Sequence, residues 1–208
     1  MGRYTGSVCR LCRRAGEKLF LKGERCLGPK CAFDKRPTPP GQVSTRRRRT
    51  SERGIQLREK QKARWIYGLL ERQMSKWYKE AKAKPGMTGE TLMQTLERRL
   101  DNIMYRVGFA DSRSQARQLV RNGHVSVNGK KLDIPSAILS VGDTVGFNVN
   151  KEKNKYYQAR IKELQNRPVP GWLSVDTTAI TGKVISLPQP KDIDTKIESR
   201  LIVEYYSR

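Results

Sequence analysis

All four cysteines of this 208-residue chain fall within its first 31 residues, in two closely spaced pairs. Two residues separate Cys9 from Cys12, and four residues separate Cys26 from Cys31. Two such pairs joined by a loop are typical of a tetrahedral thiolate site, because each short spacing places two sulfurs on one side of an ion. Four protein ligands leave no open coordination position, so we expect a structural metal site.

We expect the metal to be Zn²⁺, and an iron–sulfur cluster on the same four thiolates is the alternative. Two disulfides are disfavoured in a cytosolic protein, and structural cysteines without a metal would be scattered rather than clustered. Arg10, Arg13 and Arg14 lie beside the first pair. Their positive potential should favour the thiolate forms that metal binding requires.

A second group of residues has the chemistry and spacing to bind phosphate. Arg113, Arg117 and Arg121 recur every four residues, so they would line one face of a helix. Ser112 is positioned to cap the start of this helix, and Gly123 is positioned to end it. A helix with three arginines on one face suits a phosphate backbone better than a small molecule.

The residues after this helix predict a β-hairpin that adds further positive charge. Asn128-Gly129 is a strong signal for a two-residue turn, and Lys130 and Lys131 follow it directly. His124 is the only histidine in the chain, so paired acid–base catalysis around it has little support. We expect His124 either to contact RNA or to stabilise the turn between helix and hairpin.

The overall charge indicates a polyanion as the partner. Lysine and arginine outnumber aspartate and glutamate by 43 to 20, which gives a formal net charge of +23. A merely solvated surface would balance the two signs, so we expect nucleic acid binding. The run Arg46-Arg47-Arg48-Arg49 could be a disordered segment or a localisation tag, but beside the other basic residues it predicts a phosphate-binding arm.

Membrane association is not expected. No apolar run approaches the roughly 20 residues needed to span a bilayer, and the first residues lack a signal-peptide core. We therefore expect a cytoplasmic location. No small-molecule substrate is indicated, because the chain has neither a phosphate-cradling glycine motif nor a clustered pair of carboxylates.

The hydrophobic pattern predicts helices joined to a set of short strands. Residues 1–45 have no helical or strand period, and their prolines and glycines break regular elements. We expect helices at 52–83 with a break at Gly68, at 88–107, at 112–122 and at 151–165. We expect strands at 125–127, 144–149, 172–175, 183–187 and 201–206. The fold class is therefore α+β.

The segment Arg99–Asp143 contains RLDNIMYRVGF, SRSQARQLVRNGHVSVNGKKLDIPS and VGD. It resembles the RNA-binding domain named after the bacterial small-subunit ribosomal protein S-four family. The flanking sequence resembles the same family through MGRY, KGERC, RPTPPGQ, LREKQKARWIYG and the ending VEYYSR. The resemblance covers essentially the whole chain and rests on several long motifs.

The resemblance implies a structural, non-enzymatic role in the small ribosomal subunit. Members of the family bind 16S ribosomal RNA at a junction of helices and help to nucleate assembly of the subunit body. They contact the neighbouring protein S-five at an interface that influences decoding accuracy, and they line the region where messenger RNA enters. Some members repress translation of their own operon. Zinc-type members carry cysteines at the positions of Cys9, Cys12, Cys26 and Cys31.

The resemblance also sets the expected domain organisation. Residues 1–45 would form a Cys-clamped, metal-binding N-terminal arm, and residues 46–97 a helical domain. Residues 98–162 would form an inserted S-four-type RNA-binding domain with the basic helix and hairpin. Residues 163–208 would be a segment of short strands that packs on the preceding domains.

The residues that we expect to bind RNA combine the arginine run, the basic helix and the hairpin. They are Arg46, Arg47, Arg48, Arg49, Arg113, Gln115, Arg117, Arg121, His124, Lys130 and Lys131. The chain departs from the family pattern at Val43-Ser44, where His-Gly is usual, and at Arg53-Gly54, where an aromatic residue usually precedes the glycine. A contact made by that histidine in other members is therefore not expected here.

Two other functions would use a similar RNA-binding module. Pseudouridine synthases and one class of tRNA synthetase append it to a catalytic domain, but this chain shows no second set of catalytic residues. A small RNA-binding stress or recycling factor would not need the cysteine arm. The ribosomal role accounts for both the lack of a catalytic domain and the presence of the cysteine arm.

Overall fold

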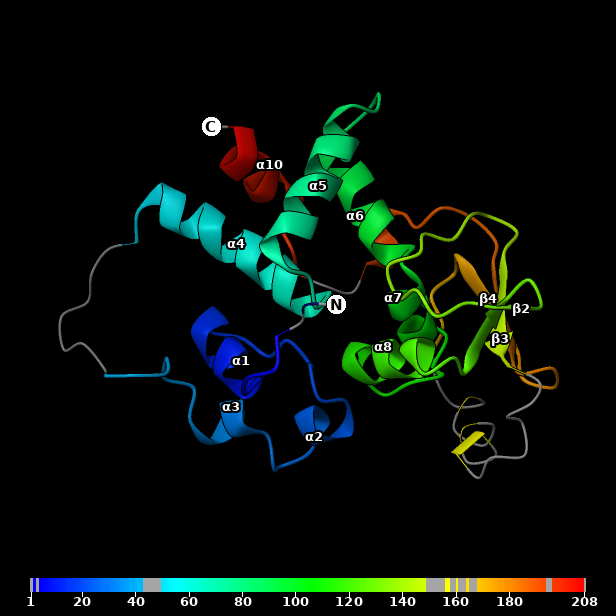
Figure 1. The fold of residues 1–208 in the computed structure, drawn as a ribbon. Helices are drawn as coiled ribbons and strands as arrows, with labels where there is room; N and C mark the ends of the chain where they lie inside the picture. The colour runs from blue at the N-terminus through cyan, green and yellow to red at the C-terminus, as the bar shows by residue number, and fades with distance from the viewer. Residues whose placement is uncertain are drawn as a thin grey trace. The chain divides into compact units, whose positions relative to one another are not determined.

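The computed structural model describes residues 2, 4–42, 50–148, 156–157, 160, 164, 168–193 and 196–207. The chain divides into two compact units (Figure 1). Met1–Met93 and Thr195–Arg208 form the first unit, and Gln94–Asp194 form the second. The second unit is thus inserted between two segments of the first. The boundaries that we predicted from the sequence divide the chain more finely and stay predictions.

The first unit begins with three short helices around the cysteines. These are α1 at Cys9–Ala15, α2 at Glu24–Leu27 and α3 at Ala32–Lys35. The prediction that residues 1–45 lack helices is wrong for these segments. Helices of one or two turns are too short to show a hydrophobic period, and tertiary contacts rather than propensity stabilise them.

Two longer helices follow, and their boundaries agree with the sequence prediction. Helix α4 spans Glu52–Ile66, and α5 spans Glu71–Lys82. Ser51 caps α4, because its Oγ accepts a hydrogen bond from the Gly54 amide at 3.2 Å. The predicted break at Gly68 is confirmed: this residue has a φ of +63°, which favours glycine.

The last described segment of the first unit is helix α10, at Ser199–Ser207, which packs along α4 (Figure 1). The prediction of a strand at residues 201–206 is therefore wrong. The run LIVEYY has the β-branched and aromatic residues of a strand, but a helix places Ile202 and Tyr206 on one face. Ile202 is fully buried there, so packing against the rest of the unit overrides the local preference.

A polar cluster joins α10 to α4 and α5 beside this apolar contact. The carboxylate Oε1 of Glu71 accepts hydrogen bonds from Lys60 Nζ and from the Tyr206 hydroxyl, both at 2.7 Å. The Tyr206 ring stacks on Tyr78 at 4.7 Å between centroids. The Lys60 ammonium, which is almost fully buried, also lies 4.4 Å from the centre of the Tyr205 ring. These contacts give a buried lysine the partners that it requires.

Three helices belong wholly or in part to the second unit, and the last of them carries the basic face. Helix α6 spans Thr88–Glu97 and crosses the boundary between the units, α7 spans Leu100–Arg106, and α8 spans Arg113–Arg121. We predicted a single helix over 88–107, but the backbone breaks between α6 and α7. Arg99 forms an isolated β-bridge with Ile138 at this point, so the break lets the chain pair with a distant loop.

An antiparallel sheet completes the second unit, with the strand order β2-β1-β3-β5-β4. The predicted hairpin is confirmed, since Val127 of β1 pairs with Lys130 of β2. The three strands predicted after the hairpin, at 144–149, 172–175 and 183–187, are present with shifted bounds, and most of the helix predicted at 151–165 lies outside the described residues. The strands are β1 at Val125–Val127, β2 at Lys130–Lys131, β3 at Thr144–Phe147, β4 at Leu173–Asp176 and β5 at Thr181–Val184, and a short 3-10 helix, η2, follows at Pro190–Asp192.

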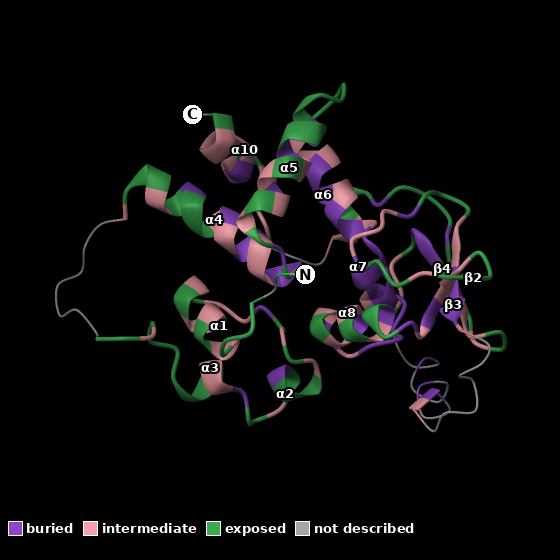
Figure 2. Ribbon diagram, in the orientation of Figure 1, coloured by how far each residue is buried: buried purple, intermediate pink, exposed green. Residues whose placement is uncertain are grey.

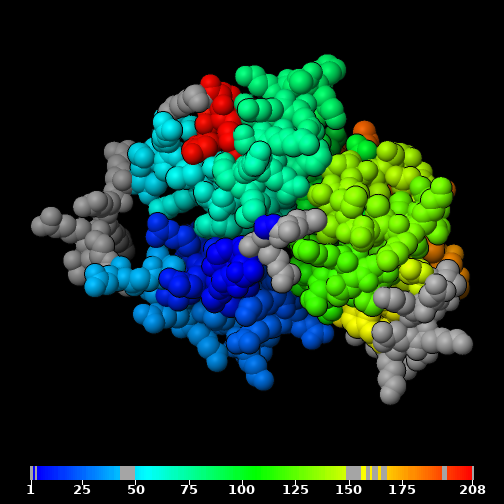
Figure 3. Space-filling view, in the orientation of Figure 1, coloured from blue at the N-terminus to red at the C-terminus, as the bar shows by residue number. Residues whose placement is uncertain are grey.

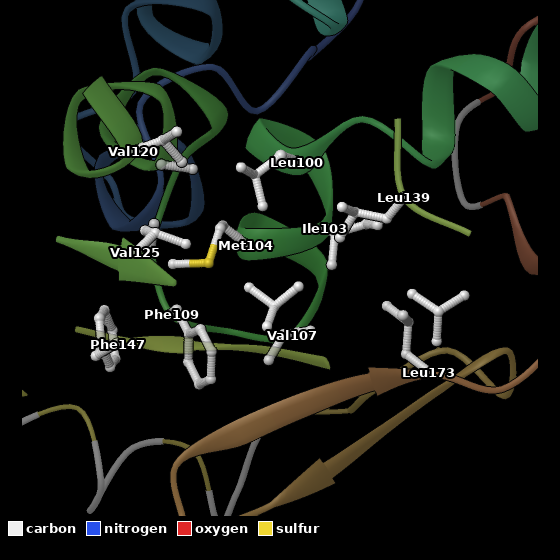
Figure 4. Packing of buried hydrophobic residues seen from close by; sticks show 14 of the residues in the cluster. Leu100, Ile103, Met104, Val107, Phe109, Val120, Val125, Leu139, Phe147 and Leu173 are labelled. Carbon is white, nitrogen blue, oxygen red and sulfur yellow. The ribbon is translucent and has the colours of Figure 1, made fainter. Parts of the chain in front are cut away.

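The core of the second unit lies between its helices and the sheet (Figure 4). Leu100 and Met104 of α7 are fully buried, as are Val107 directly after that helix and Val120 of α8. A side chain at Gly182 of β5 would lie 2.8 Å from a methyl group of Val107. The glycine therefore allows α7 to approach the sheet closely. These features confirm the predicted α+β class. Among the described residues, no helix is long and apolar enough to cross a membrane.

The cluster at Glu71 makes stability depend on pH. Burial alone raises the pKa of Glu71, but the hydrogen bonds from Lys60 and Tyr206 outweigh burial and hold that pKa below its ordinary value of 4.5. The stabilisation is therefore complete above the unfolded pKa and disappears as the pH falls through the folded pKa.

We expect Glu71→Gln to lower the free energy of unfolding by about 1 kcal/mol at neutral pH, since the carboxylate is partly exposed and its contacts are screened. Urea unfolding between about pH 7 and about pH 3 should show this difference shrinking toward acid. Glu80→Gln, at an exposed site on the same helix, is the matched control. A Glu71→Gln deficit that persists unchanged at the acid end would contradict the assignment.

Candidate nucleic-acid interface and cysteine cluster

Helix α8 has the cap and the two faces that the sequence predicts. Ser112 Oγ accepts a hydrogen bond from the Gln115 amide at 3.3 Å and so caps the helix start. Ala116 and Val120 are fully buried on the apolar side. The three arginines differ in exposure: Arg113 is half-buried, the Arg117 side chain is only 14% exposed, and Arg121 at the end of the helix is exposed.

The first two arginines of this face rest on helix α7. Arg113 Nε donates a hydrogen bond to Asn102 Oδ1 at 2.7 Å, and its guanidinium lies 4.5 Å from the centre of the Tyr105 ring. Arg117 Nη1 donates to Asp101 Oδ2 at 3.1 Å. The two side chains are therefore held in place rather than extended freely into solvent.

Asp101 and Asn102 belong to a polar network that is buried inside the second unit. Asp101 receives two hydrogen bonds from Arg99, at 3.0 and 2.7 Å. Glu97 receives two from Arg106, at 3.0 and 2.8 Å. All five of the network residues, Glu97, Arg99, Asp101, Asn102 and Arg106, are at most 7% exposed, and α7 is drawn largely as buried in Figure 2.

Sequence reasoning missed this network, although its residues lie in the RLDN segment. The sequence does contain an indication of it: charged residues occupy positions that the helical period assigns to the core. Charged groups are buried only when they are paired. The partners, however, lie up to 16 residues apart, as for Asp101 and Arg117. Local spacing does not reveal such pairs.

Gln115 and His124, which we expect to support RNA binding, have partners within the unit. Gln115 Nε2 donates to the Tyr156 hydroxyl at 3.1 Å, and Gln115 Oε1 accepts from the Asp111 amide at 2.9 Å. His124 Nδ1 lies 2.6 Å from the Tyr157 hydroxyl. Their RNA contacts stay predictions, and these bonds support the alternative that His124 stabilises the turn.

The Tyr157 hydroxyl keeps its proton when it contacts the histidine. Burial raises the pKa of Tyr157 to about 12, so its hydroxyl stays protonated at neutral pH. The hydroxyl either donates to His124 Nδ1 or accepts from it, according to the tautomer of the imidazole ring.

The hairpin presents its two lysines beside the end of α8. Lys130 and Lys131 are exposed on the edge strand β2. Asn128 and Gly129 have φ values of +50° and +77°, as the predicted turn requires. A side chain at Gly123 would clash with Lys131 Cε, so the lysine stem packs against the glycine that follows α8. Residues 46–49, the predicted arginine arm, lie outside the described residues.

The four cysteines lie on the short helices at the start of the first unit, a segment coloured blue in Figure 3. Cys9 and Cys12 belong to α1, Cys26 belongs to α2, and Cys31 directly precedes α3. Cys12, Cys26 and Cys31 are buried. The Lys22 amide donates a hydrogen bond to Cys26 Sγ at 3.3 Å, an interaction that suits a thiolate ligand.

The Cys12 thiol has a raised pKa. Burial is the main cause, and the nearby Cys26, Cys9 and Cys31 add to the increase. The expectation that Arg10, Arg13 and Arg14 favour the thiolates stays a prediction. Arg13 donates to the carbonyls of Thr38 and Pro39, at 2.8 and 3.4 Å.

The chemistry of the donor set fits a structural metal, because one short segment supplies four thiols and three of them are buried. Within the part of the chain that the structure describes, however, no three or more His, Cys, Asp or Glu side chains are arranged closely enough to hold an ion. Binding would therefore require the cysteine side chains to draw together.

Comparisons with known families identify the class of protein. Residues 3–97 match the family described as ribosomal protein S4/S9 N-terminal domain, and residues 98–145 match the S4 domain. The capped basic helix, the lysine-bearing hairpin and every residue of the buried network except Glu97 lie in the second match. The fold and the site thus define a ribosomal protein that carries an S4 domain.

Whole-chain comparisons narrow the class to one family. The chain is 54% identical to the small ribosomal subunit protein uS4A of Symbiobacterium thermophilum over 211 residues, with both chains fully covered. It is 50% and 51% identical, again with full coverage of both chains, to the uS4 proteins of Dehalococcoides mccartyi and Acetivibrio thermocellus. The chain belongs to the uS4 family of small ribosomal subunit proteins.

The packing of Lys131 on Gly123 predicts a substitution effect. Gly123→Ala should lower the free energy of unfolding by about 1–2 kcal/mol, because φ is +70° there, and should also displace the Lys131 side chain. Gly142→Ala is the control, since φ is +96° but no atom lies within 4 Å of the added methyl group. Urea unfolding and the NMR resonances of the Lys131 methylenes provide the measurements. Unchanged Lys131 resonances in Gly123→Ala would contradict the contact.

Proposed function

We propose that this protein is a structural constituent of the small ribosomal subunit in the cytoplasm and that it binds 16S ribosomal RNA through α8 and the β1–β2 hairpin. The observation that carries the proposal is the basic surface of the S4 domain, where Arg113, Arg117 and Arg121 line one face of a rigid helix. Lys130 and Lys131 extend that surface onto the adjacent hairpin. Membership of a family of ribosomal proteins supports a structural rather than a catalytic role.

Recognition is expected to depend on RNA shape and phosphate rather than on base edges. The major groove of A-form RNA is too deep and narrow for side-chain readout. Guanidinium groups that are held at fixed positions on α8 suit phosphate oxygens, to which they donate two hydrogen bonds at once. Gln115 and His124 would support this surface, and the arginine run at 46–49 would add a second set of phosphate contacts.

We infer that the cysteine segment is a metal-stabilised arm of the first unit, with Zn²⁺ as the first choice and an iron–sulfur cluster as the alternative. Cys9, Cys12, Cys26 and Cys31 would hold the metal. Its role there is to cross-link three helices that are too short to be stable alone. Lys62 supports the arm from α4 through an ion pair with Glu17 at 2.8 Å.

The finer roles follow from the resemblance to the family. We propose that the protein helps to nucleate assembly of the subunit body at a junction of RNA helices. We also propose contact with protein S-five, an influence on decoding accuracy, and a position beside incoming messenger RNA. Repression of its own operon is a further role that the same RNA-binding surface could perform.

Chemical footprinting of small-subunit RNA, with and without the protein, tests the principal proposal. Protection of one compact junction is the expected result, because a rigid surface of defined shape selects a folded site. Diffuse protection along the RNA would point instead to nonspecific basic binding and would overturn the proposal.

Phosphate binding predicts a steep dependence on salt. If about eight phosphates are neutralised, the slope of log K against log salt should be on the order of −6 to −7. Arg121→Ala should weaken binding and make the slope shallower by about 1, since Arg121 is exposed. Gln118→Ala, an exposed and uncharged site on the same helix, should change neither value. A wild-type slope near zero would exclude the mechanism.

Metal removal provides the test for the arm. Treatment with a chelator should unfold roughly the first 45 residues and leave the S4 domain folded, because metal binding supplies the folding free energy of the short helices. Amide NMR spectra before and after chelation measure this, and native mass spectrometry gives the mass of the bound metal. An arm whose amide resonances do not move on chelation would refute the proposal.

A further inference from the structure

We propose that Asp101 and Asn102 of α7 are positioning residues that hold Arg117 and Arg113 in the geometry that binds RNA. The inference rests on the proposed function of α8 and goes beyond it. It assigns a role in RNA affinity to two residues that are buried and cannot contact RNA themselves.

The geometry pairs two consecutive residues of one helix with two arginines one turn apart on another. Asp101 and Asn102 are only 4% and 1% exposed. Asp101 accepts from Arg117 at 3.1 Å, and Asn102 accepts from Arg113 at 2.7 Å. Each α8 guanidinium is therefore anchored by its own acceptor from beneath the surface.

Asp101 is shared between Arg117 and a second arginine. It accepts two hydrogen bonds from Arg99, at 3.0 and 2.7 Å, and Arg99 is fully buried. A carboxylate that is matched by one arginine does not also neutralise a second one in full. Asp101 therefore orients Arg117, while the two arginines and one carboxylate together keep a net positive charge.

The anchoring of Arg113 depends on the orientation of the Asn102 amide. Asn102 Nδ2 donates to the Glu97 carbonyl at 2.8 Å and to Glu97 Oε2 at 2.7 Å. With its nitrogen fixed on Glu97, the Asn102 side chain presents Oδ1 to Arg113. Glu97 is in turn fixed by Arg106. A buried chain of charge-assisted hydrogen bonds therefore determines where the Arg113 guanidinium lies.

Apolar packing also joins the two helices. Leu100 and Met104 of α7 pack with Ala116 and Val120 of α8 in the fully buried core. The added contacts act on the arginines, which lose less rotamer freedom on binding RNA if they are already held. Pre-organisation of this kind raises affinity without a new contact to the ligand.

Asp101→Asn gives a test in which positioning and simple electrostatics predict opposite changes in RNA affinity. The variant removes a negative charge, so attraction alone would tighten RNA binding and steepen the salt dependence. Positioning predicts the reverse, with binding about three- to ten-fold weaker, because Arg117 loses its charged anchor. Tighter or unchanged binding by the folded variant would overturn the assignment of Asp101.

Asn102→Ala tests the second residue without any change in charge, and it applies even if Asp101→Asn leaves Arg99 too poorly paired to fold. A double-mutant cycle with Arg113→Ala isolates the effect. Asn102→Ala should weaken binding about three- to ten-fold in the wild-type chain and have little effect in the Arg113→Ala chain. Equal losses in both backgrounds would overturn the proposal.

The measurements use the full chain, a small-subunit RNA fragment and urea unfolding of every variant at the same pH and salt. Gln118→Ala is the matched control and should bind like wild type. If Arg113→Ala itself binds normally, the proposed function of Arg113 fails. If Arg113→Ala binds weakly while Asn102→Ala binds normally, the function stands and the positioning role is refuted.

Discussion

The second unit depends on the pairing of charges that folding removes from water. Glu97 with Arg106, and Asp101 with Arg99, are buried ion pairs at the junction of α6 and α7. Breaking one such pair leaves an uncompensated buried charge, which typically costs about 3–5 kcal/mol. The pairs therefore admit few alternative arrangements of the backbone around residues 97–106. The break between the two helices, the bridge from Arg99 to Ile138 and the hydrogen bonds to Arg113 and Arg117 all involve this segment.

The first unit solves a similar problem in a different way. Lys60 is buried against Glu71 and the aromatic rings of α10, so one carboxylate and a pair of tyrosines surround the ammonium group. Here the partners of the buried lysine come from α5 and from α10, which is distant in sequence. In the second unit the network lies within ten residues of chain and reaches outward to α8. The Lys60 cluster joins the two ends of the first unit, and the network of the second unit orients arginines at the surface.

Much of the fold was readable from the sequence because its signals are local. The Ser112 cap, the arginine repeat and the Asn128-Gly129 turn each lie within a few residues, and the structure contains all three elements. The errors arose where distant contacts decide the outcome. Residues 201–206 have strand-like composition but form α10, because Ile202 is buried in the first unit. Asp101 and Asn102 could not be assigned, since their acceptor roles depend on α8 packing beside α7.

The insertion of one unit into the other has a consequence for the order of events during synthesis. Gln56 of α4 binds Glu204 of α10, which is 148 residues further along the chain. The ribosome that makes this protein must therefore finish the entire second unit before α10 exists. The first unit is the first to be synthesised but the last to be completed, and Lys60 lacks its aromatic neighbours until α10 has been made. A chain that terminates between the second unit and α10 would contain the whole S4 domain but an incomplete first unit. A fully folded first unit therefore requires that translation has reached α10.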